Sequence, residues 1–175
     1  MKSAMPNAMP DAMPNAMPRA LAGTINDCSL TPLSRLHLPL LAALDDSHQR
    51  RAWLELMLDE QRQGLAWPFV ARAPDGTLVG TCSLQLSGER AVEAWLGYWI
   101  APPYRRRGLG GVAVRQLIEL GFGKLGLGML QAEVWADNLP SLRLLIKLGF
   151  ATTQRCSHST GDLLKLRLRR EHAGG

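Results

Sequence analysis

The chain has 175 residues, of which 46% are hydrophobic and 20% are charged, and its formal net charge is +5. That composition is typical of a soluble domain with a sizeable core, and every apolar run is far shorter than the roughly 20 residues that span a bilayer. The three cysteines and four histidines lack the spacings of a disulfide framework or a metal site, and reduced cysteines fit the cytoplasm. We therefore expect one cytoplasmic domain with no metal and no membrane partner.

Residues 4–19 repeat a four-residue unit, AMPN-AMPD-AMPN-AMPR. Proline at every fourth position prevents both a helix and a strand ladder, and the repeat has too little bulk to build a core. It also lacks the continuous apolar stretch of a signal peptide. We expect residues 1–22 to be disordered, residues 23–171 to form one domain, and residues 172–175 to be a disordered tail.

From Thr24 onward, strand and helix patterns alternate along the chain. The helix over residues 47–64 is the clearest, because Ser47 can cap it and Gly64 can end it. Pro140 and Gly149 mark the start and the end of a later helix. The elements expected in chain order are a strand at 24–33, helices at 38–46 and 47–64, an antiparallel meander of three strands within 65–101 joined at PDG and SGER turns, a helix whose apolar face runs from 114 to 125, a strand at 129–135, a helix at 139–149 and a hairpin at 150–170.

The segment YRRRGLGG, residues 104–111, allows three interpretations. Gly108, Gly110 and Ala113 match the dinucleotide-binding spacing, but no series of parallel βαβ units surrounds them. A nucleic-acid patch would use the arginines and Tyr104, but it needs no glycines. A phosphate cradle needs both, because glycines at a helix N-terminus let backbone N–H groups point at an anion and arginines add charged contacts. The cradle is the interpretation that accounts for every part of the segment.

The strand before this segment, LGYWIAPP at residues 96–103, ends in two prolines. Proline cannot donate a ladder hydrogen bond, so we expect the strand to separate from its neighbour at this end. A separated strand beside a phosphate cradle forms a slot for a long ligand that has amides at one end and phosphates at the other.

The stretches YWIAPPYRRRGLGG and VWADNLPSLRLLIKLGF resemble the two signature motifs of the GNAT superfamily of N-acetyltransferases, in particular its RimJ/RimL-type branch. The resemblance covers about residues 25 to 168. It implies an α/β (α+β) fold with a mixed, mostly antiparallel sheet of about seven strands, helices on both faces, and strands that splay at the cofactor site. It also implies a cosubstrate, acetyl-CoA, and an amine acceptor.

The resemblance also implies roles for particular residues. Arg105, Gly108 and Gly110 supply the R/Q-x-x-G-x-G/A element, whose backbone would hold the pyrophosphate. The amides of the pantetheine arm would pair with the strand at Tyr98 to Ile100. Asn138 would contact the same arm, and Ser141 would lie near the sulfur. The implied cofactor-binding residues are Tyr98, Trp99, Ile100, Arg105, Arg106, Arg107, Gly108, Leu109, Gly110, Gly111, Asn138 and Ser141.

The catalytic groups are less complete than in the relatives. Where the related branch often has a glutamate, this chain has Trp95, and Glu93 lies two residues earlier on the same strand face. Glu93 is either a base that acts through water or an ordinary rim carboxylate. The tyrosine that many relatives use as the acid would fall at Leu145, so Ser141 or a water has to fill that role. Glu93 and Ser141 are the candidate catalytic residues.

We expect an acetyl-CoA-dependent N-acetyltransferase that acts on a primary amine. An α-amine, on a protein N-terminus or a small molecule, is favoured over a lysine because its lower pKa leaves more of it neutral and reactive. The alternatives are a non-catalytic acyl-CoA-binding module of the same fold and, more distantly, a nucleic-acid-binding protein. No nucleic-acid partner is expected, and the chain is either a monomer or a homodimer.

Overall fold

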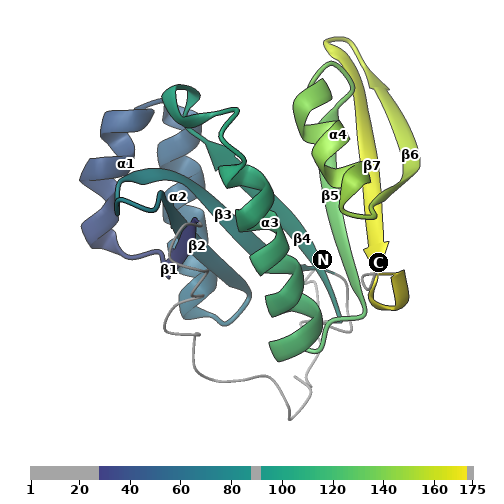
Figure 1. The fold of residues 1–175 in the computed structure, drawn as a ribbon, viewed down its shortest axis with the longest axis horizontal. Helices are drawn as coiled ribbons and strands as arrows, with labels where there is room; N and C mark the ends of the chain where they lie inside the picture. The colour runs from purple at the N-terminus through teal and green to yellow at the C-terminus, as the bar shows by residue number, and fades with distance from the viewer. Residues whose placement is uncertain (1–27, 88–91, 173–175) are drawn as a thin grey trace, which may run out of the picture.

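The computed structural model describes residues 28–87 and 92–172, in which seven strands form one mixed sheet (Figure 1). Their order across the sheet is β1-β2-β3-β4-β5-β7-β6, and of the described pairs only β4–β5 is parallel. The expected order of strands and helices is confirmed. Except for Ser87, the expected SGER turn lies outside the described residues, as do residues 1–27 and 173–175, where the disordered N-terminal segment and most of the disordered tail are expected. The strands are β1 (Ser29–Pro32), β2 (Ala66–Arg72), β3 (Leu78–Ser87), β4 (Glu93–Ile100), β5 (Met129–Trp135), β6 (Ala151–His158) and β7 (Gly161–Arg169).

In the described part of the chain, four α-helices cover both faces of this sheet, as expected (Figure 1). They are α1 (Leu38–Leu44), α2 (His48–Arg62), α3 (Leu109–Glu119) and α4 (Leu139–Lys147). Phe69 and Val70 are neighbours on β2, yet Phe69 packs in a core with α3 and α4 and Val70 in a core with α1 and α2. Successive strand side chains point to opposite faces, so the two helix pairs lie on opposite sides of the sheet. Within the described ranges, none of these helices combines the length and apolarity of a membrane span.

The local signals at the helix ends are confirmed. The Ser47 hydroxyl accepts a hydrogen bond from the Arg50 backbone N at 3.2 Å, which satisfies one of the unpaired amides at the start of α2. Pro140 lies in the first turn of α4, as expected, and the Asn138 side chain, whose capping role the sequence did not predict, accepts a hydrogen bond from the Ser141 backbone N at 3.4 Å. Gly149, which follows the C-cap residue Leu148 of α4, has a φ of +94°, the left-handed conformation that ends many helices.

The helix expected to run to Leu125 changes its winding near the end. It is α-helical up to Glu119 and continues as a π-helical turn over Leu120–Lys124, in which the Leu125 backbone N donates to Leu120 O at 2.9 Å. The apolar periodicity correctly predicts that Phe122 is buried, but it does not distinguish a π turn from an α turn.

The expected splay of two strands lies between β4 and β5. In the described structure, these strands pair over Glu93–Trp95 with Met129–Gln131 and then separate, while β4 continues along β3 as far as Ile100. The cause that the sequence suggested is wrong. Pro102 and Pro103 lie in a 3-10 turn after β4, several residues beyond the last β4–β5 pair, so they cannot be what parts the strands.

Candidate active site

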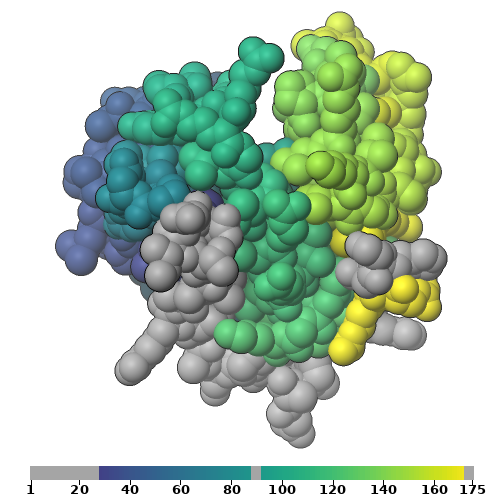
Figure 2. Space-filling model, in the orientation of Figure 1, coloured from purple at the N-terminus to yellow at the C-terminus, as the bar shows by residue number. Residues whose placement is uncertain are grey.

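A cleft of about 1060 Å³ opens between α3 and α4, where β4 and β5 have separated. Figure 2 shows it as a hollow between the segment that leads into α3 and the lobe formed by α4 with β6 and β7. The first turns of both helices and the end of β4 form its walls. The lining residues are Tyr98, Trp99, Ile100, Pro102, Tyr104, Arg105, Arg106, Gly108, Leu109, Gly110, Gly111, Arg115, Asn138, Pro140, Ser141, Arg143, Leu144 and Lys147.

The loop before α3 has the backbone conformation of an anion site. Arg106 and Gly108 adopt left-handed conformations, with φ of 62° and 78°. Alternating left- and right-handed residues turn successive N–H groups toward one point, and the first amides of a helix have no intrahelical acceptor. The first helical bond runs from Val112 N to Gly108 O at 3.2 Å, so the amides of Leu109–Gly111 precede it at the positive end of α3. The backbone of this loop thus has the conformation that a phosphate cradle needs, and the binding itself stays a prediction.

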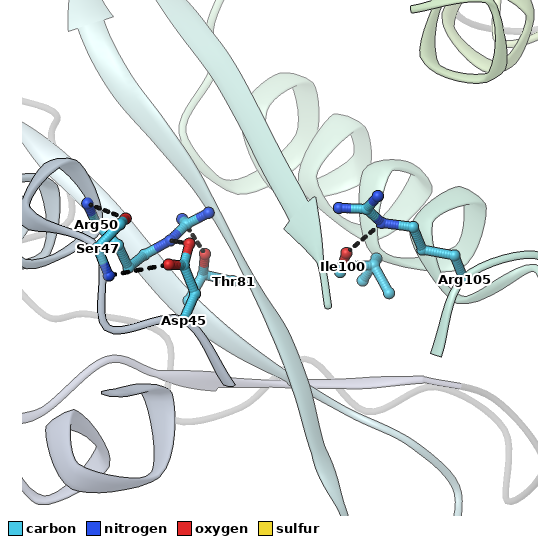
Figure 3. A network of polar contacts seen from close by, with 6 residues as sticks. All are labelled: Asp45, Ser47, Arg50, Thr81, Ile100 and Arg105. Atoms are coloured by element: carbon cyan, nitrogen blue, oxygen red, sulfur yellow. Dashed lines mark hydrogen bonds and ion pairs between the residues drawn. The ribbon is translucent and has the colours of Figure 1, made fainter. Parts of the chain in front are cut away.

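Cationic side chains from three elements surround this backbone. Arg105 is fixed by a hydrogen bond of 2.8 Å from its Nε to the Ile100 carbonyl at the end of β4 (Figure 3). The structure adds cations that the motif did not predict, all on the helices that face each other across the cleft. The cations that line the cleft are Arg105, Arg106, Arg115, Arg143 and Lys147. The chemistry that this donor set favours is the binding of a polyanion such as a group of phosphates.

Arg107 is the predicted arginine that the described lining does not include. Its guanidinium lies over the Tyr104 ring, 5.7 Å from the ring centroid. Its predicted role in holding the cofactor stays a prediction, whereas its neighbours Arg105 and Arg106 do line the cleft.

The separated end of β4 forms one wall of the cleft through Tyr98, Trp99 and Ile100. In an antiparallel pair, every second residue directs its N–H and C=O away from the partner strand. Beyond Trp95 these groups of β4 point toward the side from which β5 has departed. An extended ligand that carries amide groups can therefore pair with this edge as an added strand.

A hydrogen bond between side chains joins β4 to α4 inside the cleft. The Tyr98 hydroxyl lies 2.8 Å from the Ser141 hydroxyl oxygen. Burial raises the pKa of the Tyr98 phenol above its usual value, and the hydrogen bond with Ser141 acts in the opposite direction. The sequence placed both residues at the cofactor site, but it did not predict this contact.

Glu93 and Leu145 stand apart from the described lining of the cleft. Glu93 begins β4 and accepts a hydrogen bond of 2.9 Å from Gln131 Nε2, and it lies four residues before Gly97 on the same strand face. Gln131 thus holds the Glu93 carboxylate at the start of β4, whereas the cleft lining includes the other end of that strand. Leu145 is 1% exposed and packs in the core with α3. The role of Glu93 as a base through water stays a prediction.

Arg50, on α2, is a residue of this region that the sequence reasoning missed. Its guanidinium carbon lies over the Trp99 ring, 4.1 Å from the ring centroid. Its Nε lies 3.4 Å from the Asp45 carboxylate (Figure 3). Burial lowers the pKa of Arg50, and Asp45 opposes that change. Trp99 belongs to the cleft wall, so Arg50 braces that wall from the α1/α2 side of the sheet. No sequence pattern links a residue in the first turn of a helix to a strand so much later in the chain.

Residues 36–151 match the family described as "Acetyltransferase (GNAT) domain", which is more than half of the chain. The seven-stranded sheet with helices on both faces, the β4–β5 splay and the cradle before α3 agree with that match. The chain belongs to the GNAT family, as its two motifs predicted.

Curated relatives include an uncharacterized N-acetyltransferase YoaA of Bacillus subtilis and an uncharacterized N-acetyltransferase p20 of Bacillus licheniformis. YoaA is 32% identical over 93 residues, which are 53% of this chain and 52% of that protein. For p20 the identity is 30% over 107 residues, which are 60% of each chain. The matched part of this chain thus spans between half and three fifths of the length of these relatives.

Two solved structures have the same fold at low sequence identity. RimJ of Mycobacterium smegmatis, in complex with CoA-disulfide, has a TM-score of 0.74 at 19% identity and covers 90% of this chain and 87% of its own. Spermidine N-acetyltransferase of Vibrio cholerae, in complex with CoA and spermine, has a TM-score of 0.73 at 16% identity and covers 85% of this chain and 99% of its own. Both show the fold alone, so the RimJ/RimL-type branch stays a prediction.

Proposed function

We propose that this chain transfers an acetyl group from acetyl-CoA to a primary amine by direct attack of the amine on the thioester. The observation that carries the proposal is the cleft between α3 and α4. It has a backbone phosphate cradle at one end and an unpaired strand edge along one wall. GNAT membership and the CoA bound to the two fold neighbours support it.

The residues of the cleft fit acetyl-CoA in both charge and shape. The amides of Leu109–Gly111 and the cations around them match the phosphates, and the β4 edge at Tyr98–Ile100 matches the amides of pantetheine. Acetyl-CoA supplies the activated acetyl group and the thiol that leaves. The protein holds the thioester beside the β4 edge, where a backbone N–H can stabilise the oxyanion that forms when the amine attacks.

For the acceptor, we favour an α-amine over a lysine side chain. An α-amine has a pKa of about 7.7 to 8.0, so roughly a tenth of it is neutral at pH 7, against fewer than about one in a thousand for a lysine with a pKa near 10.4. The position of Glu93, which lies outside the described cleft lining, supports this preference, because an acceptor that loses its proton readily depends less on a nearby base.

We therefore expect a peptide with a free N-terminus and no lysine to be acetylated at least about tenfold faster than an N-blocked peptide with one lysine. Release of CoA from acetyl-CoA by the purified full chain at pH 7 measures both rates. Faster acetylation of the N-blocked peptide contradicts the α-amine assignment. Binding of acetyl-CoA with no turnover on any primary amine instead favours the non-catalytic acyl-CoA-binding module.

Replacing the Glu93 carboxylate should slow the reaction only modestly. We expect Glu93→Gln to reduce turnover of the free-N-terminus peptide by about 10²-fold or less, since we propose that the carboxylate acts through water or is an ordinary rim carboxylate. Glu133→Gln is the matched control, because Glu133 is another carboxylate on the same face of the sheet, on β5. A loss far beyond 10²-fold in Glu93→Gln alone means that Glu93 is the main base and moves toward the acceptor during the reaction.

A further inference from the structure

The reaction that we propose leaves a thiolate on CoA. At the position where many relatives carry a tyrosine that acts as the general acid, this chain has a leucine. The resemblance places that tyrosine at Leu145, which is 1% exposed and packed in the core. A leucine at that position cannot donate a proton. The leaving sulfur therefore needs a donor from another element, or none at all.

The structure offers a hydroxyl group on β4, across the cleft from α4. Tyr98 extends from β4 into the cleft, and a methyl group added at Gly110 would lie 3.4 Å from its ring atom Cε2. Its hydroxyl lies 2.8 Å from the hydroxyl of Ser141 in the first turn of α4. The side chain thus spans the cleft, with its ring against the first turn of α3 and its hydroxyl against the first turn of α4.

Tyr98 lies on the unpaired part of β4, along which an extended pantetheine arm would run. The described β4–β5 pairing stops at Trp95, and Tyr98 follows three residues later, about 10 Å along the strand. The phosphate cradle lies beyond the other end of this wall, after Ile100. A ligand with its phosphates on the cradle and its amides on β4 runs back along this wall toward Tyr98.

We propose that Tyr98 is the general acid that protonates the sulfur of CoA, and that Ser141 positions its phenol and stabilises it. This inference rests on the proposed acetyl transfer. As the amine nitrogen bonds to the carbonyl carbon, the C–S bond breaks, its electron pair goes to sulfur, and the phenolic proton follows. Tyr98 recovers a proton, through water, from the nitrogen that has just been acylated. The net result is an amide and a CoA thiol, with no other reactant.

The protonation state of Tyr98 suits this role. Burial raises the pKa of the phenol, so the group carries its proton throughout the neutral range. When the Ser141 hydroxyl donates to the phenolic oxygen, the phenolic proton is free to point at the sulfur. The same hydrogen bond stabilises the phenolate once the proton has moved, which agrees with its lowering effect on the pKa.

Single-turnover acetylation of the free-N-terminus peptide tests the proposal. We expect Tyr98→Phe to lower the rate by about 10²-fold while the Kd for acetyl-CoA, measured by calorimetry, changes less than about threefold. Ser141→Ala should also lower the rate, whereas Ser141→Thr, which keeps the hydroxyl, should restore most of it. The double variant should be no slower than Tyr98→Phe, because the two hydroxyls act as one unit. The solvent isotope effect of the wild type should vanish in Tyr98→Phe.

A second measurement does not depend on turnover. The chain has two tyrosines, so fluorotyrosine incorporated into a Tyr104→Phe variant labels Tyr98 alone. We expect its fluorine signal to titrate above the pKa of free fluorotyrosine and to shift when CoA is added. Ser141→Ala should raise the titration midpoint further.

Three results would overturn the assignment. The first is a Tyr98→Phe rate within about threefold of wild type. The second is a loss of rate in Tyr98→Phe that is matched by its loss of acetyl-CoA affinity. The third is a fluorine signal of Tyr98 that does not change when CoA is added. Failure of the proposed function looks different, because then the wild-type chain itself neither binds acetyl-CoA nor acetylates the peptide.

Discussion

Gly110→Asp should weaken acetyl-CoA binding at least about 100-fold, the largest loss of affinity that we expect from one substitution. Gly110 is the second residue of α3 and lines the cleft. A carboxylate there adds a negative charge to the first turn of α3, beside the proposed phosphate site, and two like charges about 4 Å apart near a protein surface repel by roughly 4 kcal/mol. Every 1.4 kcal/mol changes the Kd tenfold.

The fold should tolerate this substitution, because an acidic residue in the first turn of a helix is stabilising. Two control variants separate charge from bulk. In Gly110→Ala the added methyl lies 3.4 Å from the nearest atom, a Tyr98 ring carbon, which is ordinary van der Waals contact, so affinity should fall only severalfold. Gly110→Asn carries the bulk of aspartate without its charge, so its affinity for acetyl-CoA should lie between those of Gly110→Ala and Gly110→Asp. Calorimetry on folded Gly110→Asp that gives the wild-type Kd refutes the phosphate cradle.

Gly80→Ala should be the most destabilising of the substitutions considered, because the backbones of β3 and β4 approach closely at this point. A Cβ at Gly80 would lie 3.0 Å from the Cα of Ile100 and would collide with the carbonyl oxygen of Trp99. Both are backbone atoms, so no side-chain rotation relieves the overlap. We expect a loss of about 3 kcal/mol in the free energy of unfolding and a Tm lower by roughly 6 to 12 °C.

The same substitution should also weaken acetyl-CoA binding, since it displaces the end of β4. The Ile100 carbonyl that holds Arg105 belongs to that end, as does the cleft wall at Trp99. Gly123→Ala is the matched control, because a Cβ there meets no atom within 4 Å and the backbone is helical. Thermal unfolding followed by circular dichroism measures both variants. A Tm of Gly80→Ala within about 2 °C of wild type means that the two strands are not packed as closely as described.

The sequence by itself determined the order of the elements, most helix ends and the glycine-rich backbone before α3 that we propose as the phosphate cradle. These features depend on residues that are close in the chain. Ser47 caps the helix that begins one residue later, and Gly108 directly precedes the helix whose amides form the cradle. Short-range sterics and local hydrogen bonds act within a few residues, so the pattern of the sequence contains them in full.

Only the tertiary structure decided which side chains meet inside the cleft. Tyr98 and Ser141 share a hydrogen bond although 43 positions separate them in the sequence. Arg50 of α2 stacks on the Trp99 ring on the α1/α2 face of the sheet, away from α3 and α4. It also decided that β4 and β5 part at Trp95, well before the prolines. Periodicity assigns a residue to a face of its helix or strand, but it does not say which element packs against that face. That choice depends on the packing of the whole sheet between its two layers of helices, and it is what brings the Tyr98 phenol on β4 to the Ser141 hydroxyl on α4.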